Sequence, residues 1–201
     1  MDKRLKKTIE VYDNHALIFA DYADNIVLQY HCNKFISLLE GRKILDVGSG
    51  SGRDLRYFMD EKLKAYGIDL SFGMIRVAKS RGPGTFLQMD MLNLAFRDRS
   101  FDGIWSVGSL LHLSKKDAPK AIKEFWRVLR NEGVLLLGLK EGSGEGMEDS
   151  MATPGQQKFY AFYQQQEIEL MLEDQGFEIV NTIVEQAQKH NFIYIYARKK
   201  A

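Results

Sequence analysis

The stretch KILDVGSGSGRDL, residues 43–55, places a short apolar run directly before three glycines at alternate positions. Residues 44–47 predict a strand, and the residues after Gly52 predict a helix with one apolar face. In open α/β sheets, a glycine-rich turn between the first strand and a helix binds nucleotide-like ligands, because free backbone N–H groups and the positive end of the helix meet there. The stretch therefore predicts a parallel sheet with a ligand site at its first turn.

Short apolar runs alternate with helix-like stretches from residue 43 onward. The runs predict strands at residues 43–48, 64–70, 85–89, 101–107 and 133–140. This alternation is typical of a parallel sheet with helices on both faces. Two further runs, residues 177–186 and 191–199, are joined only by AQKH, which is too short for a parallel crossover. The α/β sheet is therefore predicted to be mostly parallel, with one reversed strand near its end.

The helices carry start and stop signals. In residues 117–133, Asp117 is predicted to cap the start of a helix, and the closing Asn-Glu-Gly is predicted to stop it. Ser71 is predicted to cap the following helix in the same way. Before residue 43 the chain is predicted to form a short helix over residues 11–25 and a second helix that ends at Gly41.

Length and pattern predict one domain over residues 1–201. This domain divides into a helical N-terminal cap, residues 1–41, and a Rossmann-like core, residues 42–201. Within the core, residues 141–158 are rich in Gly and Ser and are predicted to form a mobile surface loop. A lid over a site is the sharper alternative for this loop.

The composition argues against several classes of partner and site. The formal net charge is +1, so no global field attracts nucleic acid or an acidic membrane. The single cysteine, Cys32, excludes an intramolecular disulfide, and the four histidines lack metal-ligand spacing, so no metal site is predicted. No segment has the apolar length of a signal peptide or a membrane span, which predicts a cytoplasmic protein. Nothing in the composition indicates an oligomeric state.

The spacing of the glycines decides what kind of ligand the turn holds. The dinucleotide fingerprint requires glycine at the first, third and sixth positions, and the sixth position from Gly48 is Arg53. Asp46, at the end of the strand, would also repel a pyrophosphate, whereas it would attract an ammonium group. The turn thus favours an adenosine-containing ligand with a zwitterionic tail, and S-adenosylmethionine fits that description.

The stretch DVGSGSG, residues 46–52, resembles the first motif of class I S-adenosylmethionine-dependent methyltransferases. Further resemblances follow in the family's order: YGIDLSFGMIRVAK from Tyr66, QMDM from Gln88, FDGIWSVGSLLHL from Phe101, EFWRVLRNEGVLLLGLKEG from Glu124, and KFYAFYQQQEIELMLEDQGFEIV from Lys158. The last of these is similar to the family's final helix leading to a hairpin. The resemblance implies a Rossmann-like seven-stranded sheet with a reversed last strand, S-adenosylmethionine as cofactor and S-adenosylhomocysteine as product.

The resemblance also implies a set of cofactor-binding residues. Asp46 is expected near the methionine amino group, Asp69 at the ribose hydroxyls and Asp90 at the adenine amine. For Asp69, capping of the next helix is the alternative, and for Leu70 and Met74 it is core packing. The residues predicted to bind the cofactor are Asp46, Gly48, Ser49, Gly50, Gly52, Asp69, Leu70, Met74, Asp90, Met91 and Ser106.

The acceptor side of the site is predicted less specifically. His112 lies where many small-molecule members carry a histidine, and it is the candidate general base; a structural histidine is the alternative. Tyr12, Tyr22, Tyr160 and Tyr163 are candidates for lining the substrate cavity, with core packing as the alternative.

The segment after the fourth predicted strand narrows the acceptor class. Ser106-Val-Gly-Ser109 replaces the Asn/Asp-Pro-Pro-aromatic motif of members that methylate base amines or glutamine. We therefore predict a methyltransferase with a small-molecule acceptor. A protein or RNA methyltransferase and a non-catalytic S-adenosylmethionine-binding partner protein are the alternatives.

Overall fold

The apolar runs form one seven-stranded sheet in a computed structural model that describes residues 2–186 and 189–200. The strand order is β3-β2-β1-β4-β5-β9-β8. The strands are β1 Lys43–Val47, β2 Lys64–Asp69, β3 Thr85–Gln88, β4 Phe101–Val107, β5 Leu129–Lys140, β8 Phe177–Glu185 and β9 Phe192–Lys199. Only β9 runs antiparallel to its neighbours β5 and β8, which confirms the predicted Rossmann-like topology with a reversed last strand. In the predicted AQKH link, Ala187 and Gln188 lie outside the described residues.

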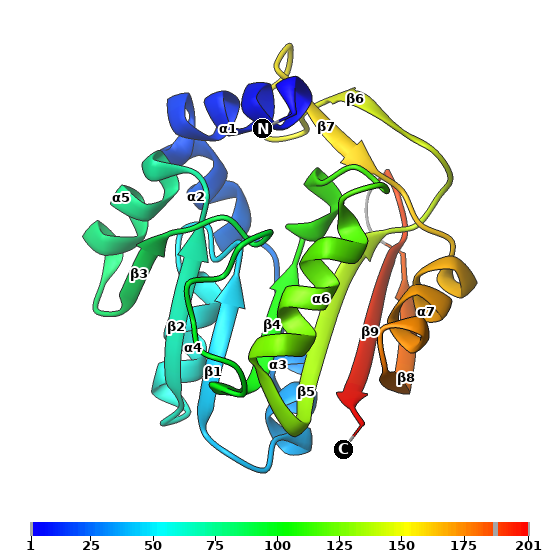
Figure 1. Cartoon of the computed structure of the whole chain (residues 1–201). Coiled ribbons are helices and arrows are strands. Elements are labelled where there is room, and N and C mark those ends of the chain that lie inside the picture. Colours follow the sequence, from blue (N-terminus) through cyan, green and yellow to red (C-terminus); the bar gives the residue numbers. More distant parts are fainter. Residues whose placement is uncertain (1, 187–188, 201) are drawn as a thin grey trace.

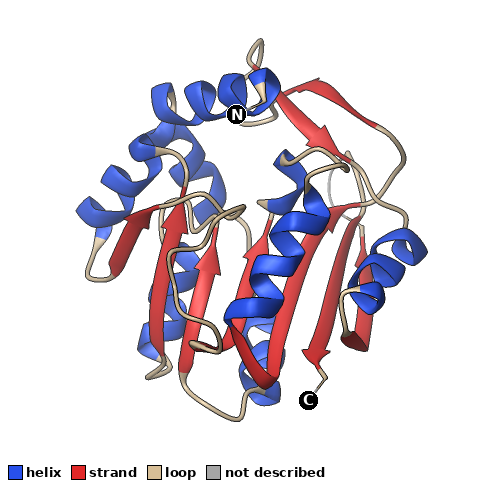
Figure 2. Ribbon diagram, viewed as in Figure 1, coloured by secondary structure: helices blue, strands red, loops and turns tan. Residues whose placement is uncertain are grey.

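Helices cover both faces of this sheet (Figures 1 and 2). They are α1 Lys3–Asn14, α2 Ala16–Asp24, α3 Gln29–Leu38, α4 Arg53–Asp60, α5 Phe72–Arg81, α6 Ala118–Val128 and α7 Gln165–Asp174, with a 3-10 turn, η1, at Leu110–His112. Because side chains alternate along a strand, Leu135 and Leu137 of β5 pack in the core cluster of α6 and α7, whereas Leu136 packs in that of α3, α4 and α5. Both faces of the sheet are therefore buried, as expected for a parallel core.

Two helix predictions were wrong at their boundaries. The segment predicted as one helix over residues 11–25 is divided at His15, whose backbone (φ −125°, ψ 26°) leaves the helical region between α1 and α2. Helix α6 stops at Val128, before the predicted Asn-Glu-Gly signal, because Leu129 already pairs with Phe101 of β4. Asp117 precedes α6 without a capping hydrogen bond to it, whereas Ser71 Oγ accepts the Met74 N–H and caps α5 as predicted.

Residues 141–158 were predicted as an irregular loop, and this interpretation was wrong for part of the segment. Strands β6 Glu145–Asp149 and β7 Gln157–Ala161 form a separate antiparallel pair. The residues from Lys158 to Ala161, predicted with the final helix, therefore belong to β7, and α7 begins only at Gln165. These residues follow the two-residue period of a strand and not the period of a helix, because Lys158 and Tyr160 lie on one face of β7 while Phe159 lies on the other.

Helix α1 lies across the carboxyl ends of the strands, between α5 on one side and β7 on the other (Figure 1). At one end, Asp13 Oδ1 accepts hydrogen bonds from Ser71 Oγ (2.6 Å) and the Gly73 N–H (2.8 Å) at the start of α5. Further along α1, Thr8 Oγ1 accepts the Phe159 N–H of β7 at 2.9 Å. Both contacts hold α1 as a roof above the edge of the sheet where β1, β2 and β4 end.

Candidate functional site

A cavity of about 540 Å³ lies beneath α1, at the carboxyl ends of the central strands. This volume falls within the range of about 300–1,000 Å³ typical of small-molecule sites. Most of the residues predicted to bind the cofactor line it: Asp46, Gly48, Ser49, Gly50, Asp69, Leu70, Met74, Asp90 and Met91. Four of the five acceptor candidates, Tyr12, Tyr22, His112 and Tyr160, line the same cavity. Residues read from distant parts of the sequence are thus brought together in one space.

Three predicted residues do not line the cavity. Gly52 lies behind the turn, at the start of α4, with the Phe86 ring against its Cα. Ser106 is fully buried, and its Oγ lies 2.8 Å from Ser109 Oγ behind the wall. Tyr163 is also fully buried, where the Lys115 ammonium faces its ring. These residues support the wall of the cavity from behind.

The glycine turn exposes backbone to the cavity. Gly48 and Gly50 adopt left-handed conformations, with φ of 73° and 53°. A Cβ on Gly48 would lie 2.2 Å from Ser109 Cβ, so a side chain there would collide with the neighbouring loop. The alternate glycines therefore serve both the backbone conformation and the close approach of the turn after β4.

Asp46 provides the clearest test of whether a cationic group fits this turn. Its Oδ2 atom is buried and, among the described residues, accepts no hydrogen bond; Ser49 Oγ, in the same glycine turn, also has no partner among these residues. Burial raises the pKa of Asp46 well above its ordinary value, and the neighbouring Asp54 adds to this effect. An ammonium group would supply the missing donor and restore the ionised carboxylate. The turn therefore fits the amino group of S-adenosylmethionine.

Asp69 organises the next part of the cavity. Its Oδ2 accepts the Gly50 N–H at 2.9 Å, and its Oδ1 accepts the Ser71 N–H at 2.8 Å. Burial raises its pKa, and the two backbone hydrogen bonds oppose that rise. The carboxylate thus ties the glycine turn to the start of α5 while still lining the cavity, where ribose hydroxyls could donate to its remaining lone pairs.

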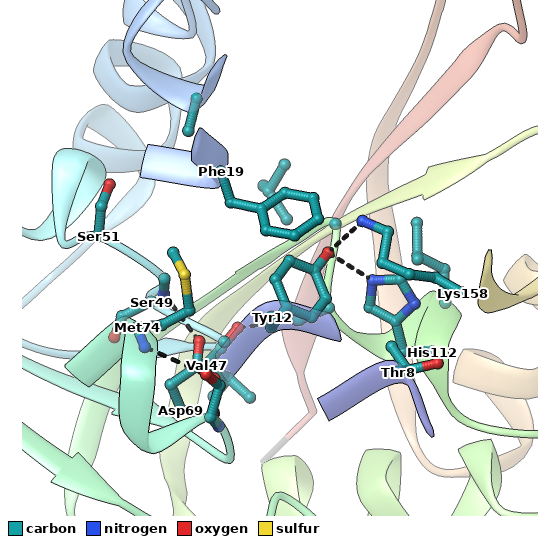
Figure 3. A pocket seen from close by; sticks show the side chains of 18 of the residues that line it. Thr8, Tyr12, Phe19, Val47, Ser49, Ser51, Asp69, Met74, His112 and Lys158 are labelled. Carbon is teal, nitrogen blue, oxygen red and sulfur yellow. Dashed lines mark hydrogen bonds between the residues drawn. The ribbon is translucent and has the colours of Figure 1, made fainter. Parts of the chain in front are cut away.

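The wall opposite the acidic residues carries a chain of polar side chains (Figure 3). Lys158 Nζ donates to Tyr12 Oη at 2.9 Å, and Tyr12 Oη lies 2.9 Å from His112 Nε2. His112 Nδ1 lies 2.7 Å from the Phe159 carbonyl oxygen, which can only accept, so Nδ1 carries the proton. Nε2 is consequently the acceptor for the Tyr12 hydroxyl.

Burial determines the protonation states of these three side chains, His112, Lys158 and Tyr12. It lowers the pKa of His112 to about 3, with Lys158 adding to the effect, so this imidazole is neutral at physiological pH. Burial also lowers the pKa of Lys158 to about 7, with a smaller contribution from Lys140. The hydroxyl of Tyr12 stays protonated because burial raises its pKa.

The sequence interpretation missed several residues that line the cavity. Lys158 and Lys140 line the cavity, as do Phe19 and Ser109. The alternation of Lys158 and Tyr160 with apolar residues is the signal that could have identified β7, but a Gly- and Ser-rich stretch precedes it. Lys140 ends β5, at the edge of a parallel sheet where ligand-binding residues gather.

Two further features are absent from residues 2–186 and 189–200. No group of three or more His, Cys, Asp or Glu side chains is arranged to hold a metal ion. No helix in these ranges combines the length and the apolar character needed to span a bilayer.

In comparisons with known proteins, the chain is similar to methyltransferases. Residues 45–137 match the model of a methyltransferase domain family. A probable tRNA methyltransferase 9B of Bos taurus is 38% identical over 98 residues, which span 48% of this chain but only 21% of that protein. An uncharacterized methyltransferase of Oceanobacillus iheyensis is 26% identical over 93% of this chain and 90% of its own length.

A solved structure extends the similarity to the whole fold. The 1,6-didemethyltoxoflavin-N1-methyltransferase of Burkholderia thailandensis, with bound 1,6-didemethyltoxoflavin and S-adenosylhomocysteine, superposes with a TM-score of 0.79 at 20% identity. The superposition covers 98% of this chain and 88% of that one. At this identity the likeness shows the fold, and it agrees with the family match and with the strand order. The chain therefore has the fold of the class I S-adenosylmethionine-dependent methyltransferases, and its residues 45–137 match a methyltransferase domain.

Proposed function

We propose that this protein transfers the methyl group of S-adenosylmethionine to a small-molecule acceptor. The observation that carries the proposal is the extent of the cavity: one continuous space reaches from Asp46 and Asp69 to Tyr12 and Tyr160, and residues of α1 and β7 line its acceptor end. Such a space is large enough for a small molecule beside the cofactor residues, and α1 restricts the approach of a folded macromolecule. The cavity extends beyond the residues assigned to the cofactor, which supports a catalytic role over a non-catalytic binding role.

The cofactor residues are assigned by the groups they offer. Asp46 would accept the amino group of the methionine moiety, and the backbone of Gly48 and Gly50 would lie against the same moiety. Asp69 would accept from the ribose hydroxyls. Asp90, whose Oδ1 accepts the Leu92 N–H at 2.9 Å, would present its other oxygen to the adenine amine, with Met74 packing on the ring.

The chemistry expected of the chain is mainly positional. When bound, S-adenosylmethionine supplies an already activated methyl group, so an acceptor lone pair needs alignment and a dry surrounding more than it needs acid catalysis. Tyr12, Phe19 and Tyr160 provide aromatic walls at the acceptor end. His112 would contribute by holding the Tyr12 hydroxyl in place, because its Nε2 is already engaged with that hydroxyl.

The proposal is tested in two steps. Calorimetry with S-adenosylhomocysteine should show one binding site per chain, and Asp46→Asn should weaken it because the amide cannot neutralise the ammonium group. Radiolabelled S-adenosylmethionine is then offered with a low-molecular-mass metabolite extract and, separately, with total RNA and with protein. Label should enter the small-molecule fraction.

An RNA acceptor is the second candidate, supported by the similarity to the tRNA methyltransferase of Bos taurus. Label in RNA, together with none in the small-molecule fraction, would replace the present proposal. Cofactor binding without label in any fraction would favour the non-catalytic role instead.

A further inference from the structure

The acceptor end of the cavity carries two lysines that no carboxylate neutralises directly. Lys158 is only 5% exposed, and Tyr12 Oη is the hydrogen-bond partner that the structure gives to its Nζ. Lys140 Nζ has neither a hydrogen bond nor an ion pair within residues 2–186 and 189–200. A buried ammonium without a counter-charge is costly, and such groups are commonly neutralised by a ligand or by a partner side chain.

One aromatic ring brings these two lysines together. Lys140 Nζ lies 3.6 Å from the centroid of the Tyr160 ring, and Lys158 Nζ lies 5.5 Å from the same centroid. Lys158 also lies 4.2 Å from the centroid of Tyr12 and 4.3 Å from that of Phe19. The two ammonium groups therefore lie beside the same aromatic ring, next to an apolar wall on which the uncharged part of a ligand could rest.

The charges around this pair are unbalanced. Glu148 is the carboxylate that acts on Lys140, and it is already shared with Lys189 at 4.0 Å and His190 at 3.4 Å. The acidic residues of the cavity are gathered at the opposite end, where Figure 3 shows Asp69 on the far side of Tyr12 from Lys158. A cation at the lysine end would meet like charges, whereas an anion would complete the site.

We propose that the methyl acceptor carries an anionic group, a carboxylate or a phosphate, and that Lys158 and Lys140 bind it. This inference rests on the proposed function, since it concerns the acceptor half of the same cavity. The acidic end would then hold the cationic cofactor and the basic end the anionic acceptor. Opposite charges at the two ends would orient the acceptor so that its uncharged part faces the methyl group.

The test uses the full chain saturated with S-adenosylhomocysteine and three probes of matched shape: benzoate, phenyl phosphate and benzamide. Binding is measured by calorimetry for the wild type and for Lys158→Met, Lys140→Met and Lys123→Met. Lys123 is exposed on α6, outside the cavity, and so controls for the loss of one positive charge. At least one anion should bind more tightly than benzamide, and each cavity variant should weaken that anion by about tenfold or more while benzamide is unaffected.

The outcomes separate the two proposals. Preference for benzoate identifies a carboxylate subsite, and preference for phenyl phosphate identifies a phosphate subsite. If S-adenosylhomocysteine binds but neither anion exceeds benzamide, or if Lys123→Met weakens the anion as much as the cavity variants do, the anion subsite is wrong and the methyltransferase proposal stands. If the wild type does not bind S-adenosylhomocysteine at all, both proposals fail. Retained S-adenosylhomocysteine affinity in Lys158→Met and Lys140→Met shows that these variants are folded.

Discussion

Replacing the buried Lys158 by methionine should make the protein more stable. Burial lowers the pKa of Lys158 from 10.5 to about 7, so at pH 7 this amine destabilises the folded state by roughly 4 kcal/mol. Methionine keeps a similar stem but loses the hydrogen bond to Tyr12 and the contacts of the ammonium with aromatic rings, together worth about 1–2 kcal/mol. We expect Lys158→Met to raise the free energy of unfolding by about 2–3 kcal/mol at pH 7.

The sign of the pH dependence makes this prediction specific. Because the pKa of Lys158 is lower in the folded than in the unfolded state, the unfolded chain binds more protons between pH 7 and 10.5, and wild-type stability gains from this group as pH rises. The advantage of the variant is therefore complete below pH 7 and is lost as pH approaches 10.5. Between pH 7 and 9.5 it should shrink by roughly 3 kcal/mol.

The measurement is urea unfolding of the wild type, Lys158→Met and the exposed control Lys123→Met at pH 7 and pH 9.5. The neighbours of Lys158 do not reproduce the expected change, because His112 is neutral throughout this range and burial raises the pKa of Tyr12. Lys140 faces the same cavity and remains in both proteins, so its contribution cancels to first order. A stability difference that stays constant with pH, or a variant less stable than the wild type at pH 7, would refute the reasoning.

Three further variants test the cofactor half of the cavity and its roof. Asp69→Ala should raise the dissociation constant of S-adenosylhomocysteine about 30- to 150-fold through lost charge-assisted hydrogen bonds, as measured by calorimetry; unchanged affinity would contradict the assignment. Gly50→Ala, at φ 53°, should lower the free energy of unfolding by about 1 kcal/mol in a urea titration, whereas no loss would show that the turn relaxes. Gly73→Ala places a Cβ 2.7 Å from the Asp13 carbonyl oxygen, so amide exchange in α1 should accelerate; exchange as slow as in the wild type would show that α1 is held elsewhere.

The cofactor half of the cavity could be predicted because its signals are local. Asp46, Gly48 and Gly50 lie in one strand-to-turn segment, and Asp69 follows at the tip of the next strand. The local backbone geometry favours particular residue types at these positions, so a short sequence motif is enough to predict them. The orphaned Oδ2 of Asp46 could not be predicted in this way, since it depends on what the folded chain fails to place beside the carboxylate.

The elements at the acceptor end, α1 and the β6–β7 pair, were harder to predict because they are stabilised by contacts with distant parts of the chain. The strand β7 is paired with β6, and its Phe159 N–H is bonded to Thr8 of α1, 151 residues away in sequence. Composition alone therefore described residues 141–158 as a loop. The break at His15 has a similar origin, because α1 extends from α5 to β7, whereas α2 packs on α5.

The two halves of the cavity differ in how far apart their residues lie in the sequence, and this difference explains why the acceptor is the less readable part of the molecule. The polar chain joins Tyr12 of α1, His112 of η1 and Lys158 of β7, so no contiguous motif contains it. A change in any one of these elements would alter the acceptor wall while leaving the turn at Gly48 intact. We therefore expect substitutions in α1 and in the β6–β7 pair to change acceptor specificity more readily than substitutions in the sheet. Among them, replacement of the charged Lys158 should have the first effect on which acceptor is bound.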